Sequence, residues 1–185
     1  MSEQHSLRKI SDEDVRIFAS LAAAIANDYL VQDDDPWVGS PFEWVKRLPS
    51  SRQRGAIGEA LVAGWAAAKG FDVTRPPTSD CDRVINGKRI EIKMSTIWNT
   101  GVYKFQQIRD QEYDFALCVG ISPFDVQAWL LPKSILKQYV IGHMGQHTGA
   151  DGGDTAWISI PAQSPFPWME EFGDRLGRVA ELLGK

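Results

Sequence analysis

The sequence predicts an α/β domain with a central mixed β-sheet flanked by helices, and three observations support this fold class. Residues 114–122 form a nearly continuous apolar run, which is typical of a central strand covered on both faces. Residues 82–95 alternate around Asn86-Gly87, the dipeptide that favours a two-residue hairpin turn. Residues 55–68 contain one charged residue, a composition that indicates a helix buried on all sides. Strands and helices therefore alternate along the chain, as in a layered α/β core.

The remaining elements are assigned from periodicity and from residues that start or stop helices. A helix is expected over residues 11–31, because an apolar stripe at helical spacing follows Ser11, a plausible N-cap. The later elements are expected in the order helical turn 42–47, helix 52–69, strand 71–75, hairpin 82–95, helix or turn 104–109, strand 114–122, strand 126–131 paired with it, helix 132–139, loop 141–154, strand 155–160 and helix 168–183. Residues 1–185 thus form one domain. It has an N-terminal helical extension (1–50), a core (52–131) and C-terminal helices with a glycine-rich loop (132–185).

Composition is that of a soluble globular protein. The chain has 185 residues, of which 43% are hydrophobic and 24% charged. No apolar run approaches the ~20 residues of a membrane span, and the N-terminus lacks the form of a signal peptide. Cys81 and Cys118 fit no zinc-ligand spacing, so we expect two buried thiols and a reduced, cytoplasmic location. Net charge is −4, but residues 36–164 hold twelve acids and fourteen bases, a balance that permits nucleic-acid binding.

The predicted hairpin carries the polar residues that are candidates for catalysis. On its return strand the side chains alternate, with Ile90, Ile92 and Met94 on one face and Arg89, Glu91, Lys93 and Ser95 on the other. Asp82 opens the preceding strand. Carboxylates can hold a hard divalent cation, and a neighbouring lysine places positive charge beside a phosphate. The hairpin therefore has the residues that metal-dependent cleavage of a phosphodiester needs.

Glu59 is the one charged residue in the apolar helix 55–68. A buried carboxylate is costly unless it is paired. It either forms a salt bridge with an arginine or serves as a further metal-site or water-orienting carboxylate, and the hairpin that follows favours the second interpretation.

These residues together resemble a known family. Glu59 in a helix, Asp82 at a strand start and Glu91-Ile92-Lys93 on the return strand look like the PD-(D/E)XK nuclease superfamily. That superfamily includes type II restriction endonucleases, Holliday-junction resolvases and repair nucleases. The resemblance covers roughly residues 52–131 and implies a restriction-endonuclease-like core. Within that core it implies a short helix bearing Gln106 and Gln107 before the apolar strand 115–121.

The resemblance also implies roles. Asp82 and Glu91 would bind Mg²⁺, with Mn²⁺ as a substitute, and Lys93 would position or activate the attacking water and stabilise charge on the phosphate. Glu59 would hold a second metal or its water shell, and Gln107 or Gln106 would contact the site or a nearby phosphate. The chain departs from the family pattern at Cys81, which stands where the first motif has proline. Asp80 competes with Asp82 as a ligand, and Asp82 is preferred because the hydrophobic strand begins there.

The expected function is a Mg²⁺-dependent DNA endonuclease of the type II restriction kind, which would act on double-stranded DNA as a homodimer. Two alternatives stay open: a structure-selective repair or Holliday-junction-resolving nuclease, and a catalytically idle DNA-binding module on the same fold. Residues expected to contact DNA are Arg52, Arg54, Ser95, Lys104, Gln106 and Arg109.

Two further groups of residues allow more than one interpretation. Trp98, Tyr103 and Lys104 could form an aromatic and basic DNA surface or belong to the core. His143 and His147 stand at a zinc-compatible spacing, but the surrounding glycines favour a contact loop over a metal site.

Overall fold

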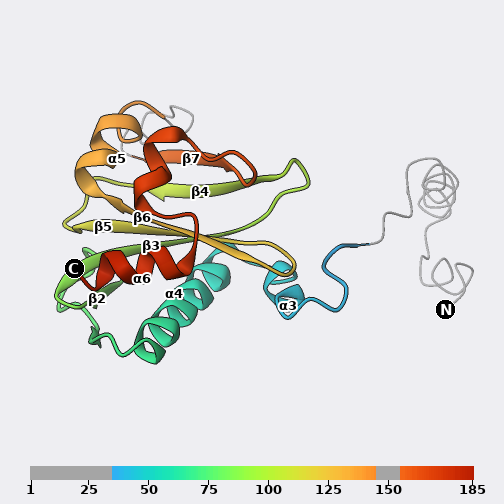
Figure 1. Ribbon diagram of the computed structural model, residues 1–185, viewed down its shortest axis with the longest axis horizontal. Coiled ribbons are helices and arrows are strands. Elements are labelled where there is room, and N and C mark those ends of the chain that lie inside the picture. The colour runs from blue at the N-terminus through green and yellow to red at the C-terminus, as the bar shows by residue number, and fades with distance from the viewer. Residues whose placement is uncertain (1–34, 145–154) are drawn as a thin grey trace, which may run out of the picture. The chain divides into compact units, whose positions relative to one another are not determined.

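The computed structural model describes residues 35–144 and 155–185 (Figure 1). Its helices and strands belong to one unit, Gly39–Lys185. The predicted helix over residues 11–31 lies outside the described residues, as do His147 and most of the predicted loop 141–154. The assignment of residues 1–185 to a single domain therefore stays a prediction.

A five-stranded sheet forms the centre of this unit. Its strands are β1 (Val73–Thr74), β2 (Arg83–Ile85), β3 (Lys88–Thr96), β5 (Phe115–Ile121) and β6 (Val126–Pro132), side by side in that order. The β3–β5 pair is parallel, whereas β1–β2, β2–β3 and β5–β6 are antiparallel. The sheet is therefore mixed, and helices flank it, which confirms the predicted fold class.

The β2–β3 hairpin forms as its sequence predicts. Ile85 pairs with Lys88 across the turn, and both turn residues adopt positive φ, 49° at Asn86 and 77° at Gly87. Asn86 also ties the turn to its surroundings, because its side chain donates to the carbonyl of Leu183 (3.2 Å) and accepts from the backbone N–H of Asp72 (3.0 Å). The turn therefore sets the register of β3 and with it the face on which each polar side chain lies.

Helices α4 (Ser51–Ala68) and α6 (Leu176–Leu183) lie along one face of the sheet (Figure 1). Ser50 caps α4 by accepting the backbone N–H of Gln53 at 3.1 Å. The prediction that this helix is buried on all sides is wrong for the described residues, because α4 buries one stripe, Gly58, Val62 and Ala66, and leaves Leu61 exposed. The missing side chain of Gly58 allows α4 to approach Met94 of β3 closely, whereas several uncharged residues of α4 are exposed to solvent.

A second, two-stranded sheet covers the opposite face. It pairs β4 (Val102–Ile108) with β7 (Ala156–Pro161), and α5 (Lys133–Tyr139) lies beside it (Figure 1). The expectation of a helix or turn over residues 104–109 is wrong. Tyr103 and Phe105 alternate into the core between the two sheets and pack with Trp129, while Phe105 pairs with Ile158 of β7. A strand buries these rings, whereas a helix would turn some of them to solvent.

The expected C-terminal helix over residues 168–183 is interrupted. A 3₁₀ segment, Pro167–Phe172, precedes α6, and Gly173 lies directly against β6. A Cβ at Gly173 would stand 2.2 Å from the carbonyl oxygen of Ala128, so only glycine fits this approach. The next residue, Asp174, adopts a φ of 88° and donates its N–H to the same carbonyl at 2.9 Å. The close contact with β6 breaks the helix.

Cys81 and Cys118 are buried free thiols, as predicted. Burial raises the pKa of both thiols, which disfavours the reactive thiolate. Within the described residues, no helix has the length and apolarity needed to cross a membrane. The cytoplasmic location stays a prediction.

Candidate active site

A cleft of about 860 Å³ lies between the start of α4, the middle of β3 and the β3–β4 connection with β4. We call it the β3 cleft. Of the residues assigned to catalysis, metal binding or DNA contact from sequence, ten line it: Arg52, Arg54, Glu59, Asp82, Glu91, Lys93, Ser95, Lys104, Gln106 and Gln107. Arg109 does not. Residues far apart in the chain therefore converge on one concave surface, the usual location of a ligand or active site.

Glu91 and Lys93 form an ion pair on β3. Lys93 Nζ lies 2.7 Å from Glu91 Oε1, and the two side chains are 18% and 11% exposed. The neighbouring strand β5 places Ala116 and Cys118 beside them, so the pair faces apolar groups on that side. Burial raises the pKa of Glu91, the positive charge of Lys93 opposes this rise, and the charges of Asp82 and Glu59 add to it. The pair combines a carboxylate and an ammonium group in a partly desolvated position.

Asp82 is held beside this pair by the backbone of β3. Its Oδ2 accepts the N–H of Ile92 at 2.7 Å, and its own N–H donates to the carbonyl of Ile90 at 3.0 Å. These bonds extend the β2–β3 pairing by one residue. Asp80, the rival candidate, instead accepts a hydrogen bond from Thr78 Oγ1 at 2.7 Å and does not line the cleft. The geometry therefore favours Asp82 as the carboxylate that acts with Glu91.

Glu59 reaches the same cleft from α4. Its Oε2 lies 3.2 Å from Arg83 Nη1, so Glu59 forms the arginine salt bridge that the sequence left as one alternative. Burial raises the pKa of Glu59, the charge of Asp82 raises it further, and Arg83 lowers it. The carboxylate therefore has an arginine partner and is also close enough to Asp82 to sense its charge. Both interpretations of Glu59 are compatible with this position.

Arg83, which the sequence did not single out, contacts two of the site residues. The same Nη1 that pairs with Glu59 donates to the backbone carbonyl of Asp82 at 2.5 Å. Arg83, the first residue of β2, thus links Glu59 of α4 to the backbone of Asp82. Its position directly after Asp82 was the available signal, but its contact with Glu59 depends on how α4 packs on the sheet.

The glutamines face the cleft because β4 contains a bulge. The register between β4 and β7 shifts between Phe105 and Ile108, and Gln107 adopts a φ of 57°. Strand alternation is broken there, so the consecutive Gln106 and Gln107 both line the cleft. The buried hydroxyl of Ser95 accepts the backbone N–H of Lys104 at 2.9 Å, which joins β4 to β3. Ser95 therefore has a structural partner within the site.

The donor atoms fit a hard divalent cation. Each carboxylate has one oxygen engaged, by Arg83 at Glu59, by the Ile92 N–H at Asp82 and by Lys93 at Glu91. Within the described residues no group of three or more histidine, cysteine or acidic side chains is already close enough to hold a metal. Mg²⁺ commonly takes only one or two carboxylates and completes its shell with water and substrate phosphate oxygens. Asp82 and Glu91 match that requirement.

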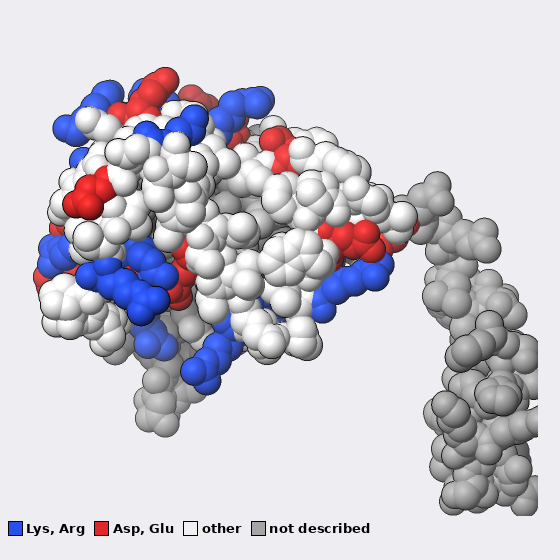
Figure 2. Space-filling view, turned by 90° about the horizontal axis from the view of Figure 1, so that it is seen from below, with Lys and Arg blue, Asp and Glu red and all other residues white. Residues whose placement is uncertain are grey.

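The rim of the cleft is basic. Lys46, Arg52, Arg54 and Lys104 line it, and the first turn of α4 contains no acidic residue. On the face shown in Figure 2, lysine and arginine side chains form separate groups with acidic side chains between them. Positive charge at the rim and negative charge at the floor is the distribution expected of a site that receives a phosphate beside a bound cation.

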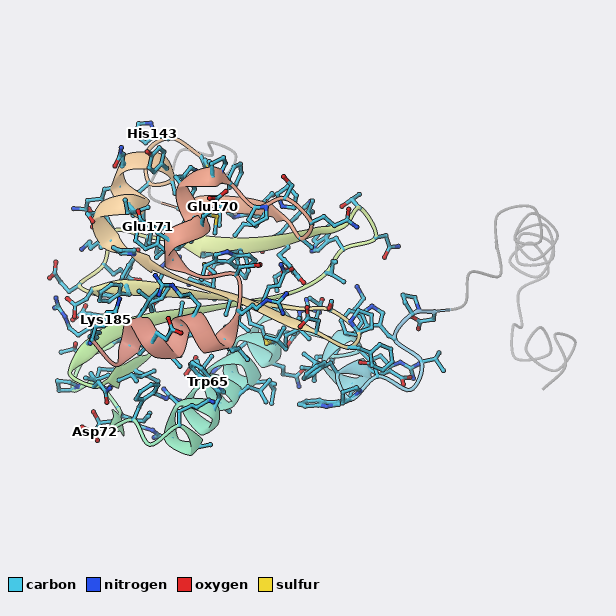
Figure 3. All side chains as sticks on the ribbon, viewed as in Figure 1. Trp65, Asp72, His143, Glu170, Glu171 and Lys185 are labelled. Carbon is cyan, nitrogen blue, oxygen red and sulfur yellow. The ribbon has the colours of Figure 1, made fainter. Side chains whose placement is uncertain are left out.

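His143 has no part in this cleft. It follows α5 at the end of the molecule opposite Trp65 of α4 (Figure 3). Its predicted partner His147 lies outside the described residues.

Comparisons with known proteins give the following similarities. No model of a known protein family matches the sequence, and no curated protein matches it. The structure is similar to that of a bacterial homing endonuclease, with 17% identity, 74% of this chain and 96% of that chain covered, and a TM-score of 0.49. It is also similar to the Holliday junction resolvase Hjc of Archaeoglobus fulgidus, with 17% identity, 69% and 96% of the two chains covered, and a TM-score of 0.39.

Proposed function

We propose that the protein is a metal-dependent DNA endonuclease of the PD-(D/E)XK superfamily. The observation that carries the proposal is the convergence of Asp82, Glu91 and Lys93 on the floor of the β3 cleft, with a basic rim around them. Two carboxylates with a lysine one residue beyond the second suit phosphodiester hydrolysis. They combine cation binding with positive charge beside the attacked phosphate.

The proposed mechanism assigns each residue a distinct task. Asp82 and Glu91 would hold Mg²⁺, or Mn²⁺ in its place, which would supply Lewis acidity and a water of lowered pKa. Lys93 orients the attacking water and stabilises negative charge on the phosphate, and its ion pair with Glu91 fixes its position. Glu59 would hold the water shell or a second cation, and Gln107 would contact the substrate phosphate. Arg83 keeps Glu59 and the backbone of Asp82 in place.

The proposed substrate is double-stranded DNA cleaved in the manner of a type II restriction enzyme. Arg52, Arg54, Lys104 and Gln106 on the rim support backbone contacts, because phosphate contacts come mainly from such cationic and amide side chains. A homodimer would place two clefts on the two strands of a twofold-symmetric site. A structure-selective or junction-resolving nuclease is the second candidate, and the exposed Trp98 at the rim favours it.

The test is cleavage of supercoiled plasmid with Mg²⁺ and without it, in the presence of EDTA. We expect cleavage only with Mg²⁺, and its loss by at least 1000-fold in Asp82→Ala, Glu91→Ala and Lys93→Ala, since each removes a group proposed to act at the reacting phosphate. Lys137→Ala is the matched control, because Lys137 is an exposed lysine that pairs with Asp110 outside the cleft.

Several outcomes separate the alternatives. Discrete fragments indicate restriction-type cleavage, and preference for branched DNA indicates a resolvase. Absence of cleavage by a folded, DNA-binding wild-type protein would support an idle binding module. Full activity of Lys93→Ala would overturn the role of that lysine.

A further inference from the structure

We infer that Trp98 is a stacking platform for an unpaired DNA base, so that the β3 cleft prefers DNA with unpaired or extruded nucleotides near the cleaved phosphate. This inference rests on the proposed nuclease function and specifies its substrate. It follows from the exposure of Trp98, the rigidity of its turn, the cations beside it and its distance from Lys93.

Trp98 combines exposure with a position at the site. The large hydrophobic side chains that are exposed within the described residues are Val38, Trp44, Leu61, Trp98 and Phe124. Trp98, at 45% exposure, is the member of this set that lines the β3 cleft. An indole at the edge of a polar cleft exposes a large flat surface to water, and such residues are enriched where partners bind.

The turn that carries Trp98 is held by backbone hydrogen bonds. Gly101 donates its N–H to the Trp98 carbonyl (2.8 Å), and the Trp98 N–H donates to Val102 (2.9 Å). Both ends are tied to other strands, since Ile97 donates to Ile121 of β5 (2.8 Å) and Ala162, after β7, donates to Gly101 (3.0 Å). Gly101 supplies the positive φ, 75°, that the turn requires. The indole is therefore presented in a defined position, which lowers the entropic cost of binding.

One cation contacts the indole, and a second binds the backbone of the preceding residue. Lys104 Nζ lies 3.8 Å from the Trp98 ring centroid, which is a cation–π contact on one ring face. Lys46 Nζ donates to the carbonyl of Ile97 at 3.3 Å, next to Trp98 in sequence. The other residues of the turn, Asn99 and Thr100, are neutral hydrogen-bonding groups that also line the cleft. An aromatic surface flanked by cations matches a nucleotide, whose base stacks while its phosphate meets positive charge.

The distance of Trp98 from Lys93 and the stacking of bases in duplex DNA together indicate which class of DNA the cleft would prefer. Trp98 follows Lys93 by five residues along β3 and the start of its turn, so the two Cα atoms are at most about 18 Å apart even if the chain between them is fully extended. The platform thus reaches nucleotides within a few positions of the cleaved phosphate. In an intact duplex both faces of each base are covered by neighbouring pairs, whereas an unpaired base can leave the stack and cover an aromatic side chain.

The experiment compares two labelled oligonucleotides of the same sequence, one fully paired and one with three central unpaired nucleotides. Binding is measured by fluorescence anisotropy in EDTA, so that no cleavage occurs. We expect wild-type protein to bind the unpaired form at least fivefold more tightly. Trp98→Ala should weaken binding of the unpaired form by about 5- to 150-fold, the range of one stacking contact, while changing duplex binding less than twofold. Trp98→Phe should retain most of the preference.

Trp44→Ala is the matched control, because Trp44 is 50% exposed and does not line the cleft. Its affinities should equal those of wild type. Equal losses on paired and unpaired DNA in Trp98→Ala, or no loss on either, would overturn the inference. Failure of the nuclease proposal has a different signature, since wild type would then not cleave either oligonucleotide with Mg²⁺. Cleavage by wild type with an unchanged preference in Trp98→Ala rejects the platform alone.

Discussion

At the scale of single residues, the central feature is that Glu91 and Lys93 lie on the same face of β3 with their charged atoms 2.7 Å apart. Because burial raises the pKa of Glu91, the lysine is needed to keep the carboxylate charged in a partly desolvated place. The same contact restrains the lysine, whose long side chain would otherwise sample many rotamers. Lys93 therefore keeps Glu91 charged for binding a cation, and Glu91 holds Lys93 in position beside a phosphate.

Arg83 gives a prediction at this scale. Arg83→Ala removes the cation that lowers the pKa of Glu59, so this pKa should rise further and Glu59 should be protonated over a wider pH range. We expect a rate loss of up to about fivefold near neutral pH, the size of a partly exposed ion pair, with recovery as pH rises. The measurement is the pH profile of plasmid cleavage.

Arg83→Lys should restore part of the rate, because it keeps the charge. Arg178→Ala removes the exposed Arg178–Glu181 pair of α6 and should leave the profile unchanged. A uniform loss at all pH values in Arg83→Ala would instead indicate a purely structural effect.

At the scale of elements, the close contact of α4 with β3 positions Glu59 over the site. A Cβ at Gly58 would lie 2.8 Å from Met94 Cβ, which is too close for real atoms, whereas Gly64 on the same helix has nothing within 4 Å. The two glycines therefore differ in function. Gly58 permits the approach of α4, and Gly64 only weakens the helix.

The two glycines make a matched pair for a stability prediction. Gly58→Ala should lower the free energy of unfolding by about 1–2 kcal/mol, because forced separation of α4 and β3 outweighs the gain in helix propensity. Gly64→Ala should raise it by about 0.5–1 kcal/mol. Urea unfolding measures both. If the two variants had the same effect, the contact with Met94 would not limit the approach of the helix.

The elements also show what the sequence could and could not predict. The β2–β3 hairpin was predictable, because Asn86-Gly87 and strict alternation are local signals, and the hairpin alone brings Asp82, Glu91 and Lys93 together. Strand β4 was not, because its alternation is interrupted at Gln106 and Gln107 and its partner β7 lies far along the chain. The contact of Arg83 with Glu59 depends on the packing of α4, for which the sequence contains no local signal.

At the scale of the whole unit, the central sheet is covered by helices on one face and by the β4–β7 sheet on the other (Figure 1). The polar side chains of β3 point toward the β4–β7 sheet. Most of that sheet is buried against the central sheet, around Trp129 and Phe105. The β3 cleft opens where that packing gives way to the start of α4 and the Trp98 turn. Carboxylates in such a place reduce stability when charged, and this cost is one that a bound cation can offset.

The loss of stability caused by these charged carboxylates leads to a prediction for thermal unfolding. The raised pKa values of Glu59 and Glu91 mean that the folded state holds these protons more tightly than the unfolded chain. Their contribution to stability is therefore complete below the ordinary glutamate pKa and is lost as pH rises through the raised values.

Mg²⁺ binds the charged carboxylates, so at pH 7.5 and about ten times its Kd it should add about 1.4 kcal/mol to the free energy of unfolding, or a few degrees in Tm. Near pH 4 it should add almost nothing, because protons compete. Differential scanning fluorimetry at both pH values measures the shift. Glu91→Gln should abolish it, whereas Glu170→Gln, an exposed site on the 3₁₀ segment outside the cleft (Figure 3), should not. A Mg²⁺ shift of equal size at both pH values would contradict binding through these carboxylates.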